Sequence, residues 1–230
     1  MTASVRARRG SSFWMRCALL FLLFAACVAP SVAADAPLSA KQLAQRVDRH
    51  YNALQSLKAD FSETYEGLGM KRAESGTLLL RKPGRMKWVY AVPAGKVFVL
   101  DGKFAWFYSA GDPQVQRIPA RELDDLRSPL RFLLGHTELA KELNGLTISP
   151  AAHGDFALTG QPQGQENRIR RLTLSVTPAG TIEGIEVEET DGAITRFAFT
   201  SQQPDAPIPV QEFHFTPPKG VPVVDAPPPV

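Results

Sequence analysis

From residue 59 onward, apolar side chains alternate with polar ones in short segments, and this alternation constrains the fold more than any other feature of the chain. It is seen in "ADFSETYE", "RMKWVY", "TIEGIEVEE" and "AITRFAFTSQ". A period of two is typical of β-strands with one dry face and one wet face. Gly and Pro interrupt the segments at roughly ten-residue spacing, as in a meander of antiparallel strands. The pattern predicts one large, strongly curved antiparallel sheet.

Two regions depart from this period and predict helices. The stretch 39–57 has apolar residues on one helical stripe, and Ser39 with Gln42 forms a capping box at its start. A second helical region is expected over 128–143, with Pro129 near a helix start. Helices placed across the mouth of a curved sheet would enclose a pocket.

Aromatic side chains concentrate in two of the expected strand segments. One is "RMKWVY", and the other is "KVFVLDGKFAWFY", in which Asp101-Gly102 is a hairpin signal. The large apolar residues that these segments place on single strand faces are Met86, Trp88, Tyr90, Phe104, Trp106 and Tyr108. They either fill the core of the sheet or line a pocket beneath the helices.

The first 34 residues have the three parts of an export signal. A positive stretch ends at Arg16, the apolar run "CALLFLLFAACVA" follows, and the small residues of "SVAADA" suit cleavage. The apolar run is too short for a comfortable transmembrane helix. Both cysteines, Cys17 and Cys27, lie in this leader. The exported domain would therefore have no disulfide and would depend on its own core.

The charge of the chain argues against a nucleic-acid-binding protein. The formal net charge is +3, but four of the 26 Lys and Arg residues lie in the leader, which has no Asp or Glu. The remaining 22 basic residues are balanced by 23 acidic ones. A nucleic-acid-binding domain would keep a positive excess. The basic residues around Lys87 therefore indicate the wet face of a strand.

No motif in the sequence predicts catalysis or metal binding. The four histidines lack metal-ligand spacing, and there is no nucleophile elbow, P-loop or dinucleotide-binding glycine motif. Glu186 and Glu188 could form an acid–base pair, but alternation places them on a solvated strand face. We expect no catalytic residue, no metal site and no cofactor.

The run "SGTLLLRKPGRMKWVY", the hairpin "VLDGKFAWFY" and the late "FHFTPPKGV", in this order, resemble the outer-membrane lipoprotein carriers of the LolA family. The shared features are a strand that ends in a basic residue and Pro, a Trp six residues after that basic residue, an Asp-Gly-Lys hairpin that leads into a Trp, and the pattern F-x-F-T-P-P-x-G-V. The resemblance extends from about Leu43 to Val224.

This resemblance implies an incomplete, half-open antiparallel β-barrel of about 10–11 strands, covered by short helices that form a lid over an apolar cavity. It implies no enzymatic activity. The expected lid helices are 39–57 and 128–143. By the same resemblance, the residues expected to bind lipid are Met86, Trp88, Tyr90, Phe104, Trp106, Leu130 and Leu133.

Lys82 is the expected lid contact. The family has a functional Arg directly before the Pro of this turn, and that Arg holds the lid closed by hydrogen bonds to helix backbone. In this chain Lys82 occupies the position, and Arg81 precedes it. Lysine can donate such bonds but lacks the planar fork of arginine. The contact would therefore differ in geometry, or Arg81 would make it.

The resemblance further implies a monomeric periplasmic carrier with no nucleic-acid partner. It would accept acylated lipoproteins from an ATP-driven inner-membrane release complex and deliver them to an outer-membrane receptor. Residues 1–34 would be a cleaved export signal, 35–224 a single carrier domain and 225–230 a disordered Pro-rich tail.

Three alternatives remain open at the level of the sequence. "FAAC", which ends at Cys27, loosely resembles a lipobox, and an acylated Cys27 would make the chain the lipid-anchored outer-membrane receptor of the same fold. A periplasmic lipid-sensing module would bind lipid without transferring it. A hydrolase would require a nucleophile in the pocket.

Overall fold

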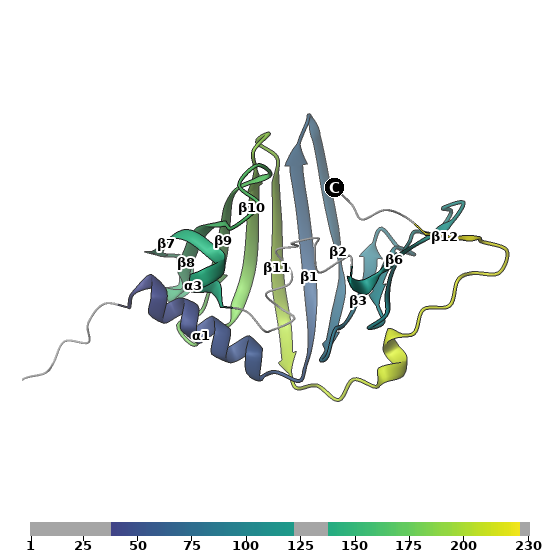
Figure 1. The fold of residues 1–230 in the computed structure, drawn as a ribbon, viewed down its shortest axis with the longest axis horizontal. Helices are drawn as coiled ribbons and strands as arrows, with labels where there is room; N and C mark the ends of the chain where they lie inside the picture. The colour runs from purple at the N-terminus through teal and green to yellow at the C-terminus, as the bar shows by residue number, and fades with distance from the viewer. Residues whose placement is uncertain (1–37, 122–137, 226–230) are drawn as a thin grey trace, which may run out of the picture. The chain divides into compact units, whose positions relative to one another are not determined.

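The computed structural model describes residues 38–121 and 138–225, all of which lie in the compact unit Leu38–Val230. Within these residues, twelve strands form a single sheet (Figure 1). In chain order the strands are β1 (Ser56–Gly67), β2 (Met70–Arg81), β3 (Arg85–Val92), β4 (Val97–Leu100), β5 (Phe104–Tyr108), β6 (Val115–Pro119), β7 (Leu143–Pro150), β8 (Phe156–Pro162), β9 (Ile169–Val176), β10 (Ile182–Glu189), β11 (Ile194–Pro204) and β12 (Val223–Asp225).

The sheet is open, because its two edges are formed by β12 and β7 and do not pair with each other. The strand order is β12-β6-β5-β4-β3-β2-β1-β11-β10-β9-β8-β7. Every neighbouring pair is antiparallel except β12 with β6. The prediction of an unclosed, mainly antiparallel sheet is confirmed, and the expected 10–11 strands become twelve. β7 is among the added strands, since the sequence predicts a helix that ends at Leu143 and no strand over 144–150.

Helix α1 (Ala40–Ala53) begins where the sequence predicts. Ser39 caps the helix, and its hydroxyl accepts a hydrogen bond from the Gln42 N–H while the Gln42 side chain accepts from the Ser39 N–H. The buried stripe consists of Leu43, Ala44, Val47 and Tyr51. The helix ends four residues earlier than expected, because Ser56 and Leu57 already belong to β1.

α1 packs against the strands at the β7 side of the sheet, and its contact with the β9–β10 turn is unusually close. Tyr51 is completely buried, and its hydroxyl accepts a hydrogen bond from the Ile182 N–H at 3.0 Å. Gly180 lies in the turn with a φ of +100°, and a Cβ atom on it would lie 2.6 Å from the Arg46 carbonyl carbon. Only glycine combines this backbone conformation with this approach.

Two segments fold differently from the prediction. In the described part of 128–143, helix α3 (Leu139–Glu142) has a single turn and leads directly into β7. Its Leu139 N–H donates to the Asp48 carboxylate of α1 at 3.1 Å. The pattern of "VQEFHFTPP" predicts a last strand, but the segment contains the 3-10 helix η3 (Val210–Phe213). The prolines around it lack the N–H groups that a paired strand needs.

The β1–β2 hairpin has a tighter turn than the sequence indicated. The stretch "GLGMKRAE" at residues 67–74 predicts a long polar turn, but Leu68 and Gly69 alone connect the strands, with φ angles of +51° and +76°. Two consecutive positive φ angles are typical of the two-residue turns that fit strand twist. For a leucine this conformation costs about 1 kcal/mol or more.

Within 38–121 and 138–225, no helix is both long and apolar enough to cross a membrane. Asp225, expected as the start of the tail, is the last residue of β12, and its carboxylate accepts a hydrogen bond from the Arg117 Nε at 2.7 Å.

Removal of the Tyr51 hydroxyl should destabilise the fold. Tyr51→Phe would leave the buried Ile182 N–H without this acceptor, so we expect the free energy of unfolding to fall by about 1–3 kcal/mol. Urea unfolding measures the loss. Tyr108→Phe is the matched control, since Tyr108 is only half-buried and its hydroxyl makes no hydrogen bond among the described residues. Equal losses in the two variants would contradict this role of Tyr51.

Candidate functional site

The face of the sheet that carries Trp88, which we call the inner face, is apolar across many strands. Directly opposed residues of neighbouring strands project to the same side. The Trp88 row runs through Leu78 of β2, Phe98 of β4 and Phe107 of β5. Met86 lies in the next row, between Leu80, Leu100 and Ala105. Met86 and Trp88 are therefore brought together as the sequence predicts, and both are buried.

Five aromatic side chains meet at the centre of the inner face and form what we call the aromatic cluster: Phe61, Trp88, Tyr90, Phe197 and Phe199. Phe61 packs edge to face on Trp88 with ring centroids 4.5 Å apart and on Tyr90 at 5.1 Å. Such arrangements are favourable beyond the area that they bury. The rings of the cluster come from β1, β3 and β11, and together they form a largely apolar region of the inner face.

Two acidic residues, Glu63 and Glu74, border the apolar part of the inner face. One row of directly opposed residues across β8, β9, β10, β11, β1 and β2 is formed by Leu158, Leu174, Ile185, Phe197, Glu63 and Glu74. Glu74 is buried, and its carboxylate binds the Lys96 ammonium at 2.5 Å and the Arg72 Nε at 3.2 Å. The apolar surface is thus bounded on this side by an ion-pair network.

The pKa values of Glu63 and Tyr90 are raised, chiefly by burial and then by acidic neighbours. Burial raises the pKa of the Glu63 carboxyl, and the neighbouring Glu74 carboxylate raises it further, while Lys96 and Arg72 oppose the shift. Burial also raises the pKa of Tyr90, and Glu63 and Glu74 add to that effect. The Lys96 ammonium lies 4.2 Å from the centroid of the Tyr90 ring, which links the charged network to the aromatic cluster.

Lys82 connects the end of β2 to the end of α1. Its ammonium donates to the Tyr51 carbonyl oxygen at 2.6 Å and to the Asn52 carbonyl oxygen at 2.9 Å. Carbonyls in the last turn of a helix lack partners within the helix, and a cation there also interacts favourably with the helix dipole. Burial lowers the pKa of Lys82, and the nearby Asp205 carboxylate opposes this.

Arg81 reaches to the other side of the sheet. It donates a short hydrogen bond to the Ile208 carbonyl oxygen in the segment after β11. A pocket of about 470 Å³ lies beside Arg81 and Lys82 and is lined also by Gln55, Ser56 and residues 206–209. Lys82, and not Arg81, therefore makes the contact with α1.

Phe104 and Trp106 do not join the aromatic cluster. In the β4–β5 hairpin, Leu100 is opposite Ala105 and Val99 is opposite Trp106, so Trp106 and Phe104 lie on the outer face with Lys87. There Trp106 packs against Phe215, with ring centroids 5.6 Å apart. Both faces of β5 are apolar, since Ala105 and Phe107 occupy the inner one, and alternation alone cannot choose between them.

The indole of Trp106 has a structural role in the same hairpin. It donates to the Asp101 carboxylate at 2.8 Å, and the Lys103 and Phe104 N–H groups donate to the same side chain. Burial acts to raise the pKa of Asp101, but these hydrogen bonds outweigh it and lower the pKa. Trp106 thus stabilises the β4–β5 hairpin through Asp101 and packs beneath Phe215 on the outer face.

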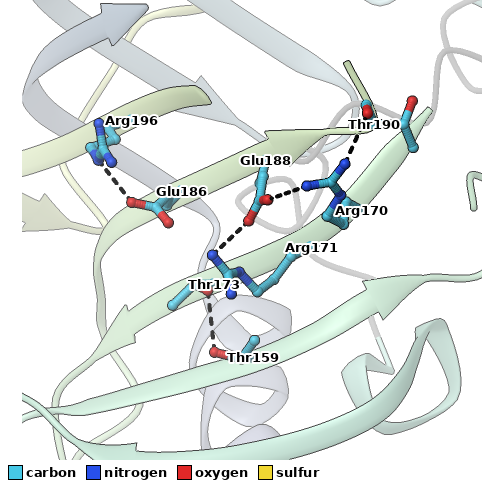
Figure 2. Close-up of polar contacts among 8 residues, drawn as sticks. All are labelled: Thr159, Arg170, Arg171, Thr173, Glu186, Glu188, Thr190 and Arg196. Carbon is cyan, nitrogen blue, oxygen red and sulfur yellow. Dashed lines mark hydrogen bonds and ion pairs between the residues drawn. The ribbon is translucent and has the colours of Figure 1, made fainter. Parts of the chain in front are cut away.

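The acidic residues Glu186 and Glu188 lie on the outer face, as alternation predicts. Figure 2 shows that the Glu186 carboxylate faces Arg196, at 2.7 Å, and that Glu188 lies between Arg170 and Arg171, at 3.0 and 2.5 Å. Carboxylates that are paired with arginines in this way are typical of a solvated sheet surface and not of an acid–base pair.

Leu130, Leu133 and Cys27 lie outside the described residues. Sequence reasoning missed Phe61, Phe197 and Phe199, although "ADFSETYE" and "TRFAFTS" show the required alternation. The information that was lacking is the pairing of β1 with β11, which brings residues about 140 positions apart to opposing places.

Comparison with known proteins places these features in a family. The family model described as "Outer membrane lipoprotein carrier protein LolA" matches residues 52–216. The outer-membrane lipoprotein carrier protein of Chromobacterium violaceum is 31% identical over 206 residues, which cover 88% of this chain and 96% of that protein. That of Proteus mirabilis is 31% identical over 185 residues, with coverage of 79% and 87%.

A structural relative supports the fold alone. An uncharacterised conserved protein from Thermus thermophilus has a TM-score of 0.53 and 12% identity, and the match covers 81% of this chain and 99% of that one.

The raised pKa of Glu63 predicts a dependence of stability on pH. A carboxyl with a raised pKa in the folded state costs stability as the pH rises above its ordinary value of 4.5, and the cost is complete above the folded-state pKa. Glu63→Gln cannot ionise. Relative to the parent, we expect it to be more stable at about pH 8 than at about pH 4, in urea unfolding.

Glu66→Gln is the matched control on the same strand. Lys71 lowers the pKa of Glu66, so the relative stability of this variant should change with pH in the opposite direction. If the two variants respond to pH in the same direction, the assignment of a raised pKa to Glu63 is wrong.

Proposed function

Because the chain belongs to the outer membrane lipoprotein carrier family, we propose that it shields the acyl chains of lipoproteins from water and carries them between membranes. The observation that carries this proposal is the aromatic cluster on the inner face. Lys82 lies near one end of β2, and towards the other end lie the ion pairs of Glu63 and Glu74 with Arg72 and Lys96, which we call the Glu63–Glu74 network. This surface offers apolar contact to acyl chains.

The energetics explain why a shielded surface is required. Burial of an acyl methylene is worth about 0.8 kcal/mol, so a 16-carbon chain gains about 12 kcal/mol and three chains about 36 kcal/mol from leaving water. Spontaneous escape from a bilayer would be negligible. A carrier must offset most of this free energy, and its binding must still be weak enough for release.

Three of the five rings of the aromatic cluster are buried, those of Phe61, Trp88 and Phe199, and this supports a mechanism with a lid. Trp88 is 2% exposed and Phe61 is 3% exposed. Acyl chains could reach these rings only if the covering side chains move away. Opening costs free energy, and this cost lowers the net affinity for cargo, as a reversible carrier requires.

We assign the lid to α1 and its latch to Lys82. The ammonium of Lys82 binds carbonyl groups in the last turn of α1, so the contact is lost if α1 swings away from β2. Met86, Trp88 and Tyr90 are the lipid-facing residues in this proposal, and Met86 can repack around varied chains because its side chain is flexible. Phe104 and Trp106 are left out because they lie on the outer face.

The setting follows from the same family membership. The family is one of lipoprotein carriers and is not known as an enzyme family, so we propose no reaction for this chain. The location would be the periplasm, and the partners would be an inner-membrane release complex and an outer-membrane receptor. The leader 1–34 would direct export.

Native mass spectrometry tests the carrier function. The protein is expressed from the full chain, purified after the cell has processed its leader, and mixed with a synthetic tripalmitoylated cysteine peptide. The same peptide without acyl chains is the control. We expect a one-to-one complex with the acylated peptide only. Absence of that complex would contradict the proposal, and a diacylglyceryl group on Cys27 in the same spectrum would make the chain a lipid-anchored receptor instead.

The latch predicts a gain of affinity. Lys82→Met removes contacts that exist only in the closed state, so opening becomes easier, and we expect binding of a fluorescent acyl probe to tighten about fivefold. Lys82→Arg should restore weaker binding because arginine can donate to the same carbonyls. Lys58→Met, on an exposed lysine of β1, is the control. Parental affinity in Lys82→Met would show that the contact serves stability alone.

A further inference from the structure

Among the large hydrophobic residues that the structure describes, the two most exposed lie at the turn between β1 and β2. Leu68 is 74% exposed and Met70 is 60% exposed. Gly67, Leu68, Gly69 and Met70 form what we call the hairpin apex. In Figure 1 the apex stands at the far end of the two longest strands, away from α1.

Leu68 lowers the stability of the turn, and a polar residue such as asparagine would suit this position better. Its φ of +51° is disfavoured for leucine, whereas Asn or Gly adopts it readily. Its side chain gains little burial in return. Asn-Gly is the preferred sequence for such a turn, and Leu-Gly stands in its place. Residues that break a local rule without a structural gain are expected at functional sites.

The shape and charge of the apex fit a lipid surface. Two apolar side chains at a convex tip can enter the boundary between headgroups and acyl chains, whereas a protein partner commonly meets a broader patch. The basic residues next to the tip are paired: Lys71 binds the Glu66 carboxylate at 2.5 Å, and Arg72 binds Glu63 and Glu74. The contact therefore depends on the apolar side chains and not on free cations, and its strength should depend little on salt.

We propose that the hairpin apex is a bilayer-contact site, at which Leu68 and Met70 insert into the membrane interface while cargo is exchanged. The proposal rests on the proposed carrier function for its purpose. Phe61 of the aromatic cluster lies on β1, seven residues before Leu68, which is about 23 Å along an extended strand. Contact at the apex would hold the bilayer close to the surface that receives the acyl chains. Two side chains provide a weak and reversible contact, which suits a carrier that must leave again.

A single labelled cysteine tests the contact directly. Both native cysteines lie in the leader, so Met70→Cys in the mature protein carries one dye at the apex. With vesicles of phosphatidylethanolamine and phosphatidylglycerol, an environment-sensitive dye at this position should brighten and shift to the blue. The matched control is the same dye on Lys103→Cys, at an exposed position in the β4–β5 hairpin, which should not respond.

Leu68→Asn separates a contact role from a structural one. Asparagine suits the positive φ, so we expect the variant to unfold at higher urea concentration than the parent. Its vesicle binding in flotation assays should fall about tenfold, because a large part of the inserted apolar area is lost. Binding of the tripalmitoylated peptide should be unchanged.

The outcomes are distinct. An apex dye that ignores vesicles, equal responses of the two dyes, or undiminished vesicle binding of Leu68→Asn would each overturn the bilayer-contact site. A response to a purified receptor protein but not to vesicles would also overturn it and would make the apex a protein contact. If the apex enters vesicles but the parent binds no acylated peptide, the carrier function fails and the bilayer-contact site stands.

Discussion

The pairing of β1 with both β2 and β11 is the constraint on which the rest of the structure depends. β11 lies near the C-terminal end of the described chain, and it pairs along its length with β1, the first strand. This pairing joins the strands from β2 to β6 with those from β7 to β10 into one sheet. It also brings Phe61 opposite Phe199 and so creates the aromatic cluster. Without it, neither the continuous inner face nor its centre would exist.

The inner face forms the core of the protein and, in our proposal, is also the surface that receives acyl chains. These two uses conflict, because a well-packed core resists opening. The conflict is eased where the aromatic cluster borders the Glu63–Glu74 network. There burial and the Glu74 carboxylate raise the pKa of Glu63, so the ionised form of Glu63 lowers the stability of the closed protein.

Two adjacent basic residues tie different parts of the chain to the end of β2. Lys82 binds the last turn of α1, and Arg81 binds the segment after β11. That segment continues through η3, where Phe213 is buried and Glu212 pairs with Lys87 on the outer face. The end of β2 thus lies between the proposed lid on one side and the cover of the outer face on the other. Movement of α1 would break the hydrogen bonds of Lys82 to the Tyr51 and Asn52 carbonyl oxygens.

Local patterns predicted the local structure well. The capping box at Ser39, the alternation in β1, β3, β10 and β11, and the Asp101-Gly102 hairpin all appear as expected, because each depends on residues close in sequence. The errors lie where tertiary contacts decide. Residues 143–150 form a strand because β8 is available to pair with them, and "VQEF" forms a turn of 3-10 helix over the outer face.

The sequence by itself determined that this chain forms an open antiparallel sheet with an amphipathic helix at its start, and its motifs placed it among the lipoprotein carriers. Alternation determines which residues of one strand share a face, because side chains of a strand project to opposite sides in turn. It does not determine which face is turned inward. Only the strand register decided that Trp88 lies within the aromatic cluster and Trp106 outside it, since register depends on pairing between strands that the sequence does not display.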